Sequence, residues 1–130
     1  MKAPRKLTLG FAEIGLYENY VVSSINEGVV LDENHLAELF EIFDSYYKGR
    51  PFVSIANREH DYTIDPNLLR DNKHPFLLGI AVICYNESSM EIANFEKKLY
   101  SGKYEIFGTI EDAVEWANDL MKNYIKKAGL

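Results

Sequence analysis

The chain has 130 residues, 47% of them hydrophobic and 26% charged, and its formal net charge is −6 at pH 7. This length fits one domain, residues 1–130, that buries roughly two-thirds of its unfolded surface, and the ordinary composition excludes a disordered chain or a coiled coil. Negative charge repels phosphate backbones and anionic lipid surfaces, so we expect no nucleic-acid partner.

Membrane insertion and secretion are not expected either. No apolar run approaches the ~20 residues that a membrane-spanning helix needs, and residues 1–6 lead into an alternating pattern rather than the apolar core of a signal peptide. The only cysteine, Cys84, lies in the apolar run 77–84, where a free thiol is typical of a small buried side chain. We therefore predict a cytoplasmic protein without an internal disulfide.

Two strands and a helix are predicted at the start of the chain. Residues 7–14 and 19–26 are the strands, and their short connection indicates an antiparallel hairpin. A helix over about residues 33–48 follows, with Asp32 as its N-cap and Gly49 as its stop. Apolar side chains recur on one face of this helix at helical spacing, at Leu36, Leu39, Phe40, Phe43 and Tyr47.

Strands and helices alternate through the rest of the chain. The predicted strands are residues 52–56, 77–84 and 104–107. The predicted helices begin at Asp65-Pro66, at the pattern Ser88-x-x-Glu91 and at the pattern Thr109-x-x-Asp112. The order ββαβαβαβα predicts one α/β domain with a mixed five-stranded sheet and about four helices. We expect the core to include Phe43, Val53, Ile55, Ile80, Val82 and Trp116.

The densest group of polar side chains follows the third predicted strand, where ligands collect in open α/β sheets. It contains Asn57, Arg58, His60 and Tyr62, and Asp65 comes shortly after. A guanidinium such as that of Arg58 can bind a carboxylate or phosphate, and His60 beside an acid can act as a general base or a pH switch. The alternative interpretation is a solvated loop in which Arg58 pairs with a neighbouring acid and His60 faces water.

Several familiar catalytic patterns are missing from the chain. It contains no glycine-rich phosphate-binding motif and no nucleophile elbow. The three histidines, His35, His60 and His74, are not spaced as metal ligands. We therefore predict no metal site and no cofactor, and we assign no catalytic residues.

Stretches distributed over nearly the whole chain carry a resemblance to a known family. They are residues 18–22, residues 49–53, Asn57-Arg58, the pattern Tyr62-x-x-Asp65-Pro66 and residues 109–116. Together they resemble the STAS / SpoIIAA-like family of anti-sigma-factor antagonists, most closely its uncharacterised bacterial branch of small stand-alone domains. Regulatory members carry an Asp-Ser-Ser/Thr-Gly-like phosphoacceptor after the third strand, but residues 57–66 contain no serine. The resemblance therefore implies a SpoIIAA-like fold without a transferred phosphosite.

We predict a non-catalytic bacterial regulatory or binding module that acts through a protein partner or a small ligand. Its site is the loop after the third strand, with Asn57, Arg58, His60, Tyr62 and Asp65 as the binding residues. Two alternatives stay open: a small enzyme that uses His60 with a nearby carboxylate as an acid/base pair, and a structural homo-oligomer, such as a homodimer, joined through surface aromatic side chains.

Overall fold

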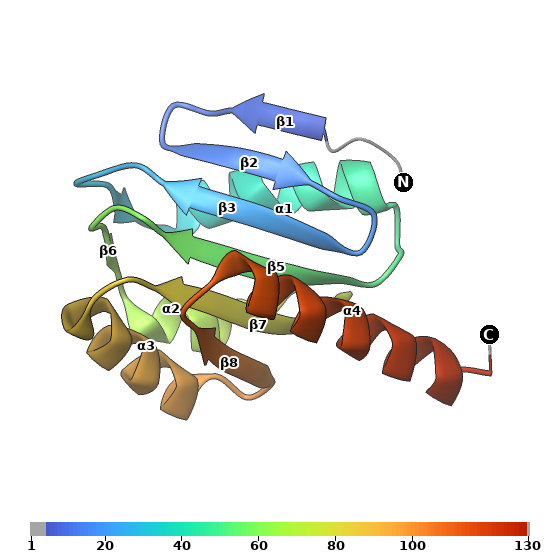
Figure 1. Cartoon of the computed structure of the whole chain (residues 1–130). Coiled ribbons are helices and arrows are strands. Elements are labelled where there is room, and N and C mark those ends of the chain that lie inside the picture. The colour runs from blue at the N-terminus through green and yellow to red at the C-terminus, as the bar shows by residue number, and fades with distance from the viewer. Residues whose placement is uncertain (1–4, 130) are drawn as a thin grey trace.

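The computed structural model describes residues 5–129, and a mixed β-sheet forms its centre (Figure 1). The strands of this sheet are β1 (Arg5–Thr8), β2 (Ala12–Leu16), β3 (Tyr20–Ile25), β5 (Phe52–Arg58), β7 (Leu77–Cys84) and β8 (Lys103–Phe107). Their spatial order is β1-β2-β3-β5-β7-β8, antiparallel from β1 to β3 and parallel from β3 onward. A separate parallel pair joins β4 (Val30–Leu31) to β6 (Thr63–Ile64).

Helices cover both faces of the sheet. They are α1 (Glu33–Tyr47), α2 (Pro66–Asp71), α3 (Glu87–Leu99) and α4 (Ile110–Lys127). In Figure 1, α4 crosses in front of the sheet, where it packs on β5, β7 and β8, and α1 lies behind the sheet. The helix α3 packs against α2 and against β7 and β8 on the face opposite α4. The predicted α/β class, the mixed sheet and the hairpin of β2 with β3 are confirmed.

Local capping interactions set where the helices begin, largely as the sequence predicts. The side chains of Asp32, Asp65 and Thr109 accept backbone N–H groups at the first turns of α1, α2 and α4. The expected start of α3 at Ser88 is wrong. Its cap is Asn86, whose Oδ1 accepts the N–H of Ser89 at 2.8 Å, so the helix begins earlier at Glu87.

The predicted strand over residues 7–14 is also wrong, because the chain reverses inside it. The N–H of Leu9 donates to the carbonyl of Ala12 at 2.8 Å, and this tight turn separates β1 from β2. Apolar residues at every second position, Leu7, Leu9 and Phe11, continue through the turn, so the alternation concealed the reversal. Within residues 5–129, the main sheet therefore has six strands rather than the predicted five.

The two faces of the sheet are packed differently. On the α4 face, one continuous cluster joins the sheet to the helix through Val53, Ile55, Ala81, Ile83, Ala113 and Ala117. On the opposite face there are two clusters, one under α1 and one under α3. Five of the six predicted core residues are buried as expected, and Trp116 is only partly buried at the edge of the α4 cluster.

Small side chains of the central strand face the space between those two clusters. Ser54 and Ala56 of β5 keep part of their surface exposed, although their strand is flanked by β3 and β7 on either side. Both residues line an internal cavity. This gap in the packing positions the candidate site.

Candidate functional site

Arg58 is the last residue of β5, which runs two residues past the predicted end of the strand. Side chains alternate across a strand, so Arg58 shares a face with Phe52, Ser54 and Ala56 and points to the side of the sheet that carries α1 and α3. Its side chain is only 8% exposed. The expectation of an exposed Arg58 on a surface loop is therefore wrong.

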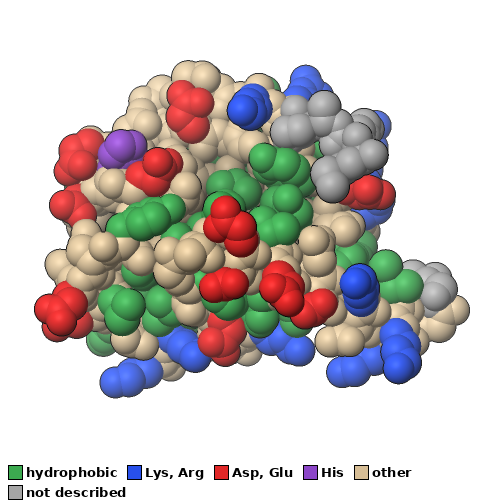
Figure 2. All heavy atoms as spheres, viewed as in Figure 1, with side chains coloured by type: hydrophobic (Ala, Val, Ile, Leu, Met, Phe, Trp, Pro, Cys, Tyr) green, Lys and Arg blue, Asp and Glu red, His purple; other side chains and the backbone are tan. Residues whose placement is uncertain are grey.

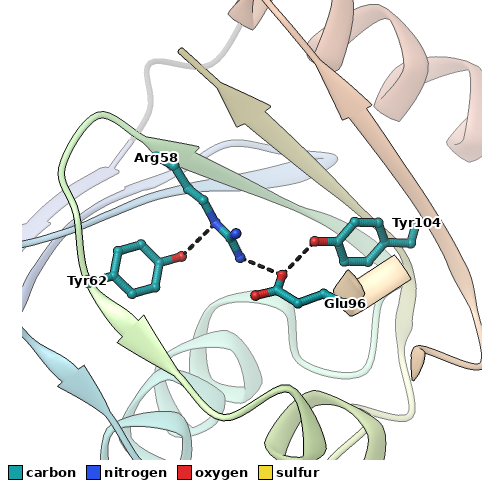
Figure 3. A network of polar contacts seen from close by, with 4 residues as sticks. All are labelled: Arg58, Tyr62, Glu96 and Tyr104. Atoms are coloured by element: carbon teal, nitrogen blue, oxygen red, sulfur yellow. Dashed lines mark hydrogen bonds and ion pairs between the residues drawn. The ribbon is translucent and has the colours of Figure 1, made fainter. Parts of the chain in front are cut away.

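Four side chains from separate elements form a polar network around this guanidinium (Figure 3). Nη2 of Arg58 lies 2.5 Å from Oε1 of Glu96, on α3, and the side chain of Glu96 is fully buried. The hydroxyl of Tyr104, on β8, donates to the same oxygen at 2.6 Å. Nε of Arg58 donates to the hydroxyl of Tyr62 at 3.1 Å. The network thus ties the end of β5 to α3, to β8 and to the segment before β6.

The surroundings of Tyr104 and Arg58 keep these two groups in the protonation states that their contacts require. Burial of the hydroxyl, followed by the adjacent Glu96 carboxylate, raises the pKa of Tyr104 above its ordinary value. Burial alone would lower the pKa of Arg58, but Tyr62 and Glu96 outweigh that effect and raise it. Tyr104 therefore remains a donor and Arg58 a cation at neutral pH.

The network borders a cavity of about 90 Å³ between the sheet and the helices α1, α2 and α3. Ser54, Ala56 and Val82 form its floor, and Arg58 and Glu96 lie in its wall. Two buried polar atoms of lining residues have no hydrogen-bond partner within residues 5–129: Oε2 of Glu96 and the hydroxyl of Tyr100. Buried polar groups are normally paired with protein or with ordered water, so these two atoms are available to an occupant of the cavity.

His74 lines the cavity from the side of α1. It is 4% exposed, and its Nε2 lies 2.7 Å from Oδ1 of Asp44. The backbone N–H of Phe76 donates to Nδ1 at 3.1 Å. Since Nδ1 accepts, Nε2 carries the proton and donates to Asp44. This arrangement fixes the imidazole ring in the cavity wall.

The structure does not bring the five predicted site residues together. Arg58 and Tyr62 face the cavity. Asn57 lies on the opposite side of the strand, where it accepts the Tyr85 hydroxyl at 2.7 Å. Asp65 is exposed and caps α2 by accepting the N–H of Asn67. Arg58, Tyr62 and His60 border one small hollow, whereas Asn57 and Asp65 lie apart from it.

His60 has surroundings unlike those of an acid/base catalyst. It is exposed, and among residues 5–129 no side-chain hydrogen bond or ion pair involves it. The carboxylate of Glu59 accepts the Ser24 hydroxyl at 2.9 Å instead. The hollow that His60 borders measures about 30 Å³, about the volume of one water molecule. No three acidic, histidine or cysteine side chains within the described part of the chain are placed to hold a metal ion.

The residues that sequence reasoning missed are Glu96, Tyr100 and Tyr104. Glu96 lies on the buried stripe of α3 with Ser89 and Ala93, at spacings of four and three residues. A carboxylate on such a stripe requires a cation nearby, because burying an unpaired charge is costly. That requirement was a signal in the sequence for a buried basic partner.

Comparison with known proteins informs the fold of this chain. No family model and no curated protein matches it. Its structure is similar to the crystal structure of an uncharacterised protein of the DUF3478 family from Shewanella loihica PV-4, described as having a SpoIIAA-like fold. The TM-score is 0.55 and the sequence identity 14%, over 88% of this chain and 92% of the other.

This chain has a SpoIIAA-like fold. The fold implied by the sequence resemblance is thereby confirmed. In this SpoIIAA-like domain, the end of β5 supplies Arg58 and the connection after it supplies Tyr62 to a buried network. Within residues 5–129, no helix combines the length and the apolar character needed to cross a bilayer.

Proposed function

We propose that the protein is a non-catalytic binding module that holds a small organic ligand in the cavity beside Arg58 and Glu96. The unpartnered buried oxygen of Glu96 carries this proposal, together with the Tyr100 hydroxyl at the same cavity. Leaving a buried carboxylate oxygen without a donor costs free energy, and a ligand that supplies the donor recovers it.

The character of the cavity supports this assignment. Aliphatic and aromatic side chains form most of its wall, and one end carries the polar network around Arg58. Further polar lining residues are Ser23, Ser54, Asn72, Lys73 and His74. Small-molecule sites typically combine an apolar lining with a small number of placed polar groups. The polar end contains Arg58, Tyr62, Glu96, Tyr100 and Tyr104.

Residues 62–64, in the loop that was predicted to form the site, are the outer wall of the proposed cavity site. Tyr62 and Ile64 line the cavity on one side and an outer groove on the other. The groove measures about 390 Å³ and contains the exposed side chains of Ile92 and Phe95 on α3. Residues 62–64 thus separate the cavity from the surface.

The α4 face of the sheet, which lies opposite the cavity, is acidic, and this supports the expectation that nucleic acid is not a partner. Figure 2 shows acidic side chains gathered over the region of α4. Its exposed acidic residues are Glu111, Asp112, Glu115 and Asp119. Phosphate groups are repelled by such a surface.

Titration with two small probes tests the proposed function. Pyrrole and furan are neutral five-membered rings, smaller than the benzene that a cavity of about 150 Å³ can hold. We expect saturable shifts of the methyl NMR signals of Leu77, Ile80 and Val82, which line the cavity, with at least one probe. The methyl signals of Ile55 and Ile83, on the α4 face, should not move.

A cavity-filling variant and a matched control localise the binding. Ala56→Leu adds three carbon atoms into the cavity from its floor and should abolish the shifts. Ala37→Leu makes the same change at an exposed position of α1 and should leave them intact. No saturable shift with either probe, or equal binding by both variants, would refute the proposed function.

A further inference from the structure

The two oxygens of Glu96 have unequal surroundings. Oε1 accepts from both Nη2 of Arg58 and the hydroxyl of Tyr104, whereas Oε2 is buried and has no partner within residues 5–129. An ionised carboxylate oxygen can only accept hydrogen bonds. A group that binds at Oε2 must therefore be a hydrogen-bond donor.

The charges around the cavity disfavour an ionic ligand. Glu96 is already balanced by Arg58, so a cation would leave a net positive charge in a buried site. A second cation is close, because Nζ of Lys73 lies 5.6 Å from the ring centroid of Tyr100. An anion would face the lone pairs of Oε2. At the position beside Oε2, both charged classes thus meet an unfavourable environment.

We infer that the ligand is a neutral, compact and largely apolar molecule that donates an N–H or O–H hydrogen bond to Oε2 of Glu96. This inference rests on the proposed function of the cavity. The ligand class includes azoles, small amides and alcohols. The Tyr100 hydroxyl, which can donate or accept, is available to a second polar atom of the ligand.

Ordered water is the competing occupant of this site. A cavity of about 90 Å³ has room for about three water molecules, and a water molecule can donate to Oε2 and contact Tyr100 as well. Water binding predicts no selection between small neutral rings of the same size. Donor selection is therefore the property to measure.

The affinities of pyrrole and furan for the wild-type protein test the inference. The two rings are nearly the same size, but only pyrrole has an N–H donor. We expect pyrrole to bind about tenfold more tightly, which is the ratio for one hydrogen bond to a charged acceptor. Equal affinities would overturn the inference and leave the proposed function standing. Binding of neither ring would overturn both and indicate that the cavity holds only water.

A substitution that exchanges acceptor for donor provides the sharper test. In Glu96→Gln, the two donors Arg58 and Tyr104 require the amide oxygen at the position of Oε1, so the NH₂ group replaces Oε2. The preference for pyrrole should then disappear. Glu87→Gln makes the same change at an exposed position of α3, outside the cavity, and as the control it should keep that preference. A preference that persists in Glu96→Gln would overturn the inference, and the wild-type ratio decides it if this variant does not fold.

Discussion

Removal of the buried guanidinium by Arg58→Met should destabilise the protein strongly. The substitution keeps an unbranched side chain of moderate length, but within residues 5–129 it leaves the fully buried carboxylate of Glu96 with Tyr104 as its only donor. Breaking a buried ion pair on one side costs about 3–5 kcal/mol, because the remaining charge is uncompensated. Loss of the hydrogen bond to Tyr62 adds about 1 kcal/mol at most.

The expected loss of free energy corresponds to a shift in melting temperature that depends on the length of the chain. At about 2.1 cal/mol/K of unfolding entropy per residue, a 130-residue chain shifts its melting temperature by about 4 °C per kcal/mol. A loss of about 4 kcal/mol therefore lowers the melting temperature by about 15 °C. Urea unfolding followed by the fluorescence of Trp116, the only tryptophan, measures the free energy independently.

Two further variants separate charge burial from simple loss of contacts. Arg70→Met removes an arginine from an exposed pair with Asp71, whose side chains are 50% and 60% exposed, and should leave the melting temperature essentially unchanged. Arg58→Met with Glu96→Leu removes both buried charges and should recover more than half of the loss. A single Arg58→Met variant that melts within about 2 °C of the wild type would refute the reasoning.

Three other predictions concern packing and ionisation. Phe43→Ala truncates a side chain that is 6% exposed and should reduce the free energy of unfolding by about 3–5 kcal/mol in urea. Gly79→Ala places a Cβ 3.0 Å from the ring of Trp116 and should cost about 1–3 kcal/mol in the same assay, whereas Gly108→Ala has open space and should not. Burial, followed by Glu96, raises the pKa of Tyr104, so above pH 10 the unfolded state loses a proton that the folded state keeps. Stability should therefore fall as pH rises from 9 to 11, and the slope should be smaller in Tyr104→Phe.

The parts of the fold that depend on local interactions could be predicted from the sequence. Asp32 and Thr109 cap helices because their side chains accept N–H groups within three residues. The stripe on α1 is periodic, and Leu36, Leu39, Phe43 and Tyr47 are buried. Strand β6 carries no such signal, since a two-residue strand is too short to show an alternation.

The candidate site was only half predictable because its decisive contact is remote in sequence. Arg58 and Glu96 are 38 residues apart, and arginine is seldom fully buried unless it is paired. Because no acidic partner for a buried Arg58 can be recognised in the neighbouring sequence, the polar residues after β5 indicate an exposed loop. The spacing of Ser89, Ala93 and Glu96 on one face of α3 is the local pattern that predicts a buried acid.

The distribution of packing over the sheet explains why the site lies where it does. A single helix, α4, closes one face with small residues such as Ala113 and Ala117 against the strands. The opposite face is divided among three helices, and Ser54 and Ala56 line the cavity beneath them. At about 24 cal/mol per Å³, a cavity of about 90 Å³ lowers stability by about 2 kcal/mol. A cavity-filling Ala56→Leu variant that packs well should thus melt at or above the wild type while losing the probes, because the added carbon atoms recover packing that the cavity lacks.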